Sequence, residues 1–158
     1  MNEESLDKST EGLVKVLFEL PEDETHRSAE TLWAEPVGSE LYRLRNIPIY
    51  VYGFSSVDIV TAVSIDDRLT VTGIASRSGH STYRVFLSED SSSESFENDW
   101  ASLAELGCSY ERATRRCVGI DVPPAADVYA VYQSLEKGER SHRWTFEEGH
   151  CGHPLRHQ

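Results

Sequence analysis

The chain has 158 residues, which is enough for one domain or for two small units. Its composition, 39% hydrophobic and 27% charged, is typical of a soluble globular protein. The formal net charge of −12 excludes nucleic acid and an anionic membrane as main partners, because both are bound through Lys and Arg. Another protein, including a basic one, remains compatible with this charge.

The N-terminus and the cysteines favour a cytoplasmic location. No stretch approaches the roughly 18 apolar residues of a membrane span. The opening "MNEESLDKSTEG" lacks the basic start and the apolar core of a signal peptide. Three cysteines, an odd number without an evident disulfide framework, suit a reducing compartment.

Residues 1–11 are expected to form a mobile leader, and residues 12–81 an all-β half. "LVKVLFEL" alternates in the manner of a strand. Four further short segments are rich in aromatic and β-branched residues, namely "TLWAEPV", "ELYRLRNIP", "VDIVTAVS" and "RLTVTGIAS". Turn signals such as "IDDR" separate them, which predicts a small β-barrel or sheet. The intervening "IPIYVYGFSSVD" is compatible with a further strand and with an ordered apolar loop.

Residues 82–149 are predicted to form a ferredoxin-like half, and residues 150–158 a polar tail. "TYRVFLS" is a strand, and helical spacing then links Phe96, Trp100, Leu103 and Leu106. "CSYER" and "RCVGIDV" read as a hairpin with its turn centred on Thr114. A second helix is expected to begin at Pro123 and Pro124 and to stop at Gly138, before the strand "HRWTFEE". The order is βαββαβ, so the predicted class is α+β, with the barrel half packed against the ferredoxin-like half.

Three segments resemble an uncharacterised bacterial family, domain of unknown function 4265 (DUF4265). They are "ETLWAEPVGSELYRLRNIPIYVYGFSSVDIV", "RSGHSTYRV" and "LGCSYERATRRCVGIDVPPAADVYAVYQSL". One departure is "GFSSVDIV", where such families tend to carry "SLGD", so that Ser56 and Val57 replace the usual small turn. The resemblance implies no established activity. The second half is also similar in layout to the regulator-of-ribonuclease-E family, small acidic proteins that bind an enzyme, which implies a protein partner.

The segment "SRSGHSTYRVF" gathers charged and hydrogen-bonding side chains between apolar runs. Ser78 and His80 share one face of an extended chain, as a nucleophile and its base could. A triad also needs an orienting carboxylate, and only Asp66 and Asp67 lie near in sequence, without a Gly-x-Ser-x-Gly elbow. We therefore expect a join between the halves and predict no catalytic residue. A ligand or anion site is the alternative, formed by Arg77, His80, Tyr83 and Arg84.

The C-terminal "HCGHPLRH" offers side chains that ligate Zn²⁺, namely His150, Cys151, His153 and His157. Their spacing matches no established zinc finger, so no cofactor is predicted and zinc stays an alternative. Cys108 and Cys117 are expected to be partly buried structural residues.

An aromatic run adds a candidate partner surface, formed by Tyr42, Tyr50, Tyr52 and Phe54. Core packing is the default for such a stripe, and an exposed stripe would bind protein. The leading hypothesis is a non-enzymatic regulator or immunity-type inhibitor that binds a protein through this stripe or through the acidic segments 22–24 and 89–99. The alternatives are a small-molecule or anion-binding module at Arg77, His80 and Arg84, and a metal-dependent enzyme using the C-terminal His/Cys cluster.

Overall fold

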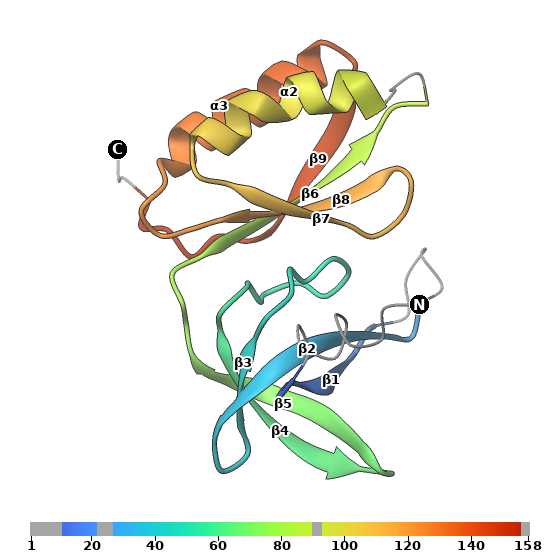
Figure 1. The fold of residues 1–158 in the computed structure, drawn as a ribbon, viewed down its shortest axis with the longest axis vertical. Coiled ribbons are helices and arrows are strands. Elements are labelled where there is room, and N and C mark those ends of the chain that lie inside the picture. The colour runs from blue at the N-terminus through green and yellow to red at the C-terminus, as the bar shows by residue number, and fades with distance from the viewer. Residues whose placement is uncertain (1–10, 22–26, 90–92, 156–158) are drawn as a thin grey trace. The chain divides into compact units, whose positions relative to one another are not determined.

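The computed structural model describes residues 11–21, 27–89 and 93–155, which form an α+β fold of two compact units (Figure 1). One unit holds the described residues up to Asn46 together with Val57–Arg77. The other holds Ile47–Ser56 and the described residues from Ser78 onward. The expected leader lies almost wholly outside the described residues. The segment Ile47–Ser56, which the sequence placed in the all-β half, belongs to the second unit.

The first unit is a closed barrel whose strands are neighbours in chain order. Adjacent strands are antiparallel, and β1 closes the barrel by pairing in parallel with β5 at Leu17 and Thr70. The barrel alternative of the sequence analysis is thus confirmed. The strands are β1 (Val14–Glu19), β2 (Ala29–Gly38), β3 (Leu41–Leu44), β4 (Ile59–Ile65) and β5 (Arg68–Ser76).

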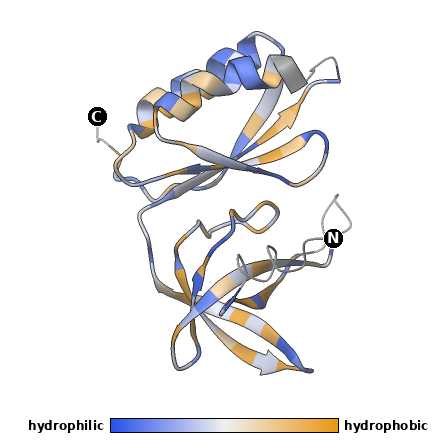
Figure 2. Cartoon of the chain, viewed as in Figure 1, coloured by the Kyte–Doolittle hydropathy of each residue, from blue (hydrophilic) through white to orange (hydrophobic). Residues whose placement is uncertain are grey.

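Alternation along the strands fills the interior of the barrel. Val16 and Phe18 of β1 are buried, as are Leu32 and Ala34 of β2, while the residues between them are more exposed. Figure 2 shows the matching change of hydropathy along these strands. Burial of this single inward face is what holds the short strands together.

Turns of the first unit use left-handed backbone conformations, among them those at Asp66–Asp67 and at Val57. Asp66 and Asp67 have φ of 51° and 64° between paired Ile65 and Arg68, as a two-residue type I′ hairpin requires. The "IDDR" turn is therefore confirmed. Val57 also has a left-handed φ, of 70°, although a β-branched residue disfavours it. Two backbone bonds hold this site, because the Val57 N–H donates to the Leu44 carbonyl at 3.0 Å and the Leu44 N–H donates to the Asp58 carbonyl at 2.9 Å.

The second unit is an antiparallel sheet in the order β7-β8-β6-β9, with both helices on one face (Figure 1). Val85, Val118 and Leu135 are fully buried in the core between the helices and the sheet. No helix among the described residues is long and apolar enough to cross a membrane. The elements are β6 (Ser81–Leu87), α2 (Ser93–Glu105), β7 (Ser109–Arg112), β8 (Cys117–Val122), α3 (Val128–Arg140) and β9 (Trp144–His150).

The bounds of α3 differ from the prediction at both ends. The helix begins at Val128, because the Asp127 carboxylate accepts from the Tyr129 and Ala130 N–H groups at 3.0 and 3.2 Å. Gly138 does not end it. The helix continues to Arg140, and Gly138 is needed for packing, since a Cβ there would lie 2.2 Å from the Trp144 ring.

The β7–β8 hairpin has another register than expected. Glu111 pairs with Gly119 and not with Cys117, so the turn is centred on Arg115 and not on Thr114. The reason is local, because the N–H groups of Ala113 and Thr114 both donate to the Cys117 carbonyl and lengthen the loop.

Candidate functional site

The loop Ile47–Ser56 covers part of the helix-free face of the second sheet. Ile47 and Ile49 pack with Cys117, and a Cβ on Gly119 would lie 2.3 Å from Ile49 Cδ1. The Ile47 N–H donates to Glu111 Oε2 at 2.7 Å. Of the two alternatives for this segment, the ordered apolar loop is therefore confirmed.

Arg84 of β6 makes the main polar contacts between the sheet and the loop Ile47–Ser56. Its guanidinium donates to the carbonyls of Tyr50 and Val51 at 3.5 and 3.4 Å. The Tyr52 ring lies 4.1 Å from Arg84 Cζ, and Glu147 Oε1 lies 3.4 Å from Arg84 Nε. Arg84 is only 3% exposed, so these contacts compensate a buried charge. Its role is to hold the loop on the sheet.

Tyr52 is exposed and yet held in place. Its residue surface is 53% exposed, while its hydroxyl donates to Glu147 Oε1 at 2.8 Å and its ring stacks on Arg84. Phe86, 40% exposed, lies two residues beyond Arg84 on β6 and so projects from the same face. We call Tyr52 and Phe86, with Glu147 beside them, the aromatic patch.

The other residues of the predicted aromatic stripe do not share this exposure. Tyr50 and Phe54 are half-buried in the same loop. Tyr42 is half-buried on β3 of the barrel unit. The expected stripe depended on strand alternation, which a bent loop does not provide. Of the predicted set, Tyr52 is the residue that the structure exposes most.

His80 and Asp121 form a polar pair at the beginning of β6. His80 Nδ1 lies 2.9 and 3.0 Å from the two Asp121 carboxylate oxygens. Burial raises the pKa of Asp121, and the hydrogen bond with His80 opposes that rise. Asp121 is the carboxylate beside His80, in place of Asp66 and Asp67, because the pairing of Thr82 with Asp121 in the sheet brings it there.

Ser78 is not arranged as a nucleophile for this pair. Its hydroxyl donates to the Ser56 carbonyl at 2.8 Å and accepts from the His80 backbone N–H at 3.2 Å. These contacts fix the backbone before β6, where Gly79 has a φ of 89°. The backbone bends at Gly79, directly before His80.

The C-terminal segment is anchored and not only a polar tail. His153 is buried, with Nδ1 at 2.6 Å from the Ser81 hydroxyl and Nε2 at 2.9 Å from the Pro123 carbonyl. Because a carbonyl only accepts, Nε2 carries the proton and Nδ1 accepts from Ser81. Both ring nitrogens are therefore engaged in structural hydrogen bonds.

The remaining predicted zinc ligands do not assemble a site within the described residues. His150 and Cys151 are half-buried, and His157 lies outside the residues that the structure describes. In the described part of the chain, no group of three or more His, Cys, Asp or Glu side chains is placed to hold a metal ion.

The residues of the predicted anion site belong to both units and, within the second unit, to both faces of the sheet. Arg77 belongs to the barrel unit, where its guanidinium lies 3.4 Å from Asp58. Tyr83 is buried on the helix side against Tyr132 and Phe146, and burial raises its pKa. Tyr83 and Arg84 are consecutive on a strand and so point to opposite faces, which prevents them from lining one site.

Cys108 and Cys117 are both buried, and neither forms a disulfide bond. Burial raises the pKa of the Cys108 thiol to about 12, which opposes formation of a thiolate. This agrees with the structural role expected for Cys108.

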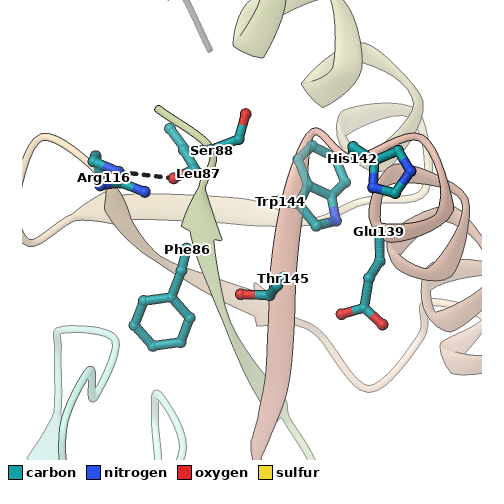
Figure 3. A pocket seen from close by; sticks show the side chains of 8 residues that line it. All are labelled: Phe86, Leu87, Ser88, Arg116, Glu139, His142, Trp144 and Thr145. Carbon is teal, nitrogen blue, oxygen red and sulfur yellow. Dashed lines mark hydrogen bonds between the residues drawn. The ribbon is translucent and has the colours of Figure 1, made fainter. Parts of the chain in front are cut away.

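A pocket of about 260 Å³ lies where β6 ends and β9 begins (Figure 3). The β7–β8 turn contributes Arg116 to it, and the end of α3 contributes Glu139 and His142. No local sequence pattern indicates this pocket, because segments far apart in the chain supply its walls. The other lining residues are Phe86, Leu87, Ser88, Trp144 and Thr145.

These features define an α+β protein in which a closed five-stranded barrel is joined to a four-stranded sheet with two helices. A solved structure from Neisseria gonorrhoeae, described as a hypothetical protein, is similar over 89% of this chain and 96% of that one. The TM-score is 0.77 and the identity 16%, so the likeness shows the fold alone. The model of domain of unknown function 4265 matches residues 30–146, and the chain belongs to this family, as its three segments predicted. No curated protein matches it.

Proposed function

We propose that the chain is a non-enzymatic protein-binding module, a regulator or immunity-type inhibitor, that recognises a basic partner through the aromatic patch. The observation that carries this proposal is Tyr52, whose ring is exposed although Arg84 and Glu147 hold it in one position. Ordering a side chain on binding costs about 0.5–1.5 kcal/mol. A ring that is already ordered avoids most of this cost, and tyrosines are frequent interface anchors.

The charge around the patch favours a basic partner. Glu147, whose side chain is 41% exposed, lies beside Tyr52 and accepts from its hydroxyl. An incoming Lys or Arg would meet an aromatic face together with a carboxylate, a combination that binds cations. The net charge of −12 would also raise the association rate with a basic protein.

We further propose that the second unit is ferredoxin-like. The element order and the strand order β7-β8-β6-β9, with both helices on one face, support this assignment. The layout shared with the regulator-of-ribonuclease-E family supports a protein partner by analogy only. A cytoplasmic location stays part of the proposal, supported by Cys108, Cys117 and Cys151, none of which forms a disulfide bond.

The test is capture from a lysate of the source organism on immobilised protein, with variants deciding specificity. We expect a basic protein to be retained at low salt, released by about 0.5 M NaCl because screening weakens charge attraction, and lost with Tyr52→Ala and Glu147→Gln. Leu155→Ala is the control, since Leu155 is a large exposed apolar residue of the same unit.

The captured protein would then be titrated against each variant. Loss of a hot-spot anchor of about 2 kcal/mol weakens binding about 30-fold. Retention of the same protein by Tyr52→Ala, or an acidic captured protein, would contradict the proposal. Phe86→Ala is a second variant, should Tyr52→Ala loosen the loop and lose its native circular dichroism spectrum.

A further inference from the structure

We infer that the pocket at the end of β6 and the start of β9 binds a small organic carboxylate with a compact apolar body. This site is separate from the partner recognition proposed above, although Phe86 belongs to both. The inference depends on the side chains that line the pocket: the exposed Phe86 ring, the Arg116 guanidinium, and the hydroxyl and imidazole groups near them (Figure 3).

The walls suit an apolar body of modest size. Phe86, 40% exposed, supplies the aromatic surface, whereas Leu87 and Trp144, 5% and 4% exposed, contribute little. Ligand pockets commonly measure about 300–1,000 Å³, so one of about 260 Å³ accommodates a ligand smaller than most drugs. A single ring or a short branched chain fits this description.

Arg116 supplies the charge for a carboxylate. Its Nε donates to the Leu87 carbonyl at 2.9 Å, which orients the guanidinium at the pocket. Among the described residues, its terminal nitrogens have one charged neighbour, the exposed Glu89, with Nη1 3.7 Å from Oε1. Such an exposed pair is worth little, so a ligand carboxylate that binds the guanidinium through two oxygens would displace it.

Two hydroxyls and an imidazole complete the donor set. Ser88, Thr145 and His142 line the pocket, and within the described residues no hydrogen bond engages their side chains. Glu139 is the one carboxylate of the lining, and its Oε2 accepts from the Phe146 N–H at 3.2 Å. Ser88, Thr145 and His142 can each donate to an anion, as Arg116 can, whereas Glu139 is the one lining side chain that only accepts.

His142 has a backbone conformation that glycine usually provides. Its φ is 59°, directly after the C-cap Ser141 of α3, where left-handed glycine is common. The His142 N–H donates to the Glu139 carbonyl and the Arg143 N–H to the Gly138 carbonyl, at 3.1 and 3.0 Å, which is the Schellman motif that ends a helix. This motif accounts for the left-handed φ and fixes His142 at the rim of the pocket.

The test is a titration of ¹⁵N-labelled protein with benzoate, using neutral benzamide, which has nearly the same shape, as the comparison probe. We expect benzoate to shift the amide signals of Phe86, Ser88, Arg116 and Thr145, and to bind about tenfold more tightly than benzamide. Arg116→Gln should remove this difference. Arg115→Gln, in the same turn but outside the lining, is the matched control and should keep it.

Equal binding of the two probes, shifts elsewhere in the protein, or no shift at about 10 mM benzoate would overturn the inference. If Arg116→Gln does not fold, as loss of its dispersed NMR spectrum would show, His142→Asn serves as the test variant instead. Asparagine tolerates a left-handed φ but lacks the imidazole. That variant should weaken benzoate binding, and unchanged binding would count against the site. Tyr52→Ala should leave benzoate binding intact, which separates failure here from failure of the partner proposal.

Discussion

Val57 provides a test of the backbone that the structure assigns to the "SSVD" segment. With φ at 70°, any residue that carries a Cβ is disfavoured there by about 1–2 kcal/mol. We therefore compare Val57→Gly with Val57→Ala, because both remove the same side-chain contacts and only alanine keeps the strain. At ordinary positions the more flexible glycine is the less stable of the two by about 0.5–1 kcal/mol.

The two effects together give the size of the expected difference. Glycine relieves about 1–2 kcal/mol of backbone strain but loses about 0.5–1 kcal/mol through its greater flexibility when unfolded. Val57→Gly should therefore be more stable than Val57→Ala by about 0.5–1 kcal/mol. Relative to the wild type, Val57→Gly should change little. Val57 is 40% exposed, and the loss of its remaining burial offsets the relief of strain.

The assay is urea unfolding followed by circular dichroism and tryptophan fluorescence. With a slope of about 2 kcal/mol per molar, we expect the midpoint of the glycine variant to lie about 0.3–0.5 M above that of the alanine variant. Ala101→Gly, at an exposed position of α2, is the control and should lower stability by about 1 kcal/mol. Equal midpoints for the two variants at position 57, or a higher one for alanine, would refute the left-handed assignment.

Two further predictions concern the second unit. Gly138→Ala should lower the stability of this unit by about 3 kcal/mol or more in urea unfolding. The new Cβ would lie 2.2 Å from the Trp144 ring and would disturb the hydrogen bond from Trp144 Nε1 to the Leu135 carbonyl. A gain in stability, as alanine usually gives inside a helix, would contradict this. Asp121→Asn tests the raised pKa of Asp121. The folded wild type holds this proton to a higher pH than the unfolded chain, so it should lose stability relative to the variant as pH rises from about 3.9, the ordinary Asp value, through the raised pKa. Urea midpoints between pH 3.5 and 6 measure this difference, and a constant difference would show that the Asp121 pKa is ordinary.

Local patterns in the sequence were sufficient for most of the elements. Val16 and Phe18 alternate with more exposed residues because a strand places every second side chain on one face. The "IDDR" turn and the apolar spacing of α2 follow from equally short-range preferences. Such signals depend on neighbours within a few residues, so the sequence alone displays them.

The tertiary structure decided what depends on pairing between distant segments. The loop Ile47–Ser56 belongs to the second unit because Arg84 donates to its carbonyls and Gly119 leaves space for its isoleucines. No local pattern in the loop predicts these two contacts. The aromatic patch, the His80–Asp121 pair and the pocket around Arg116 also depend on sheet register, and a shift of one residue would turn each side chain to the opposite face. The sequence therefore predicted which residues could bind or react, whereas only the register determined which of them meet.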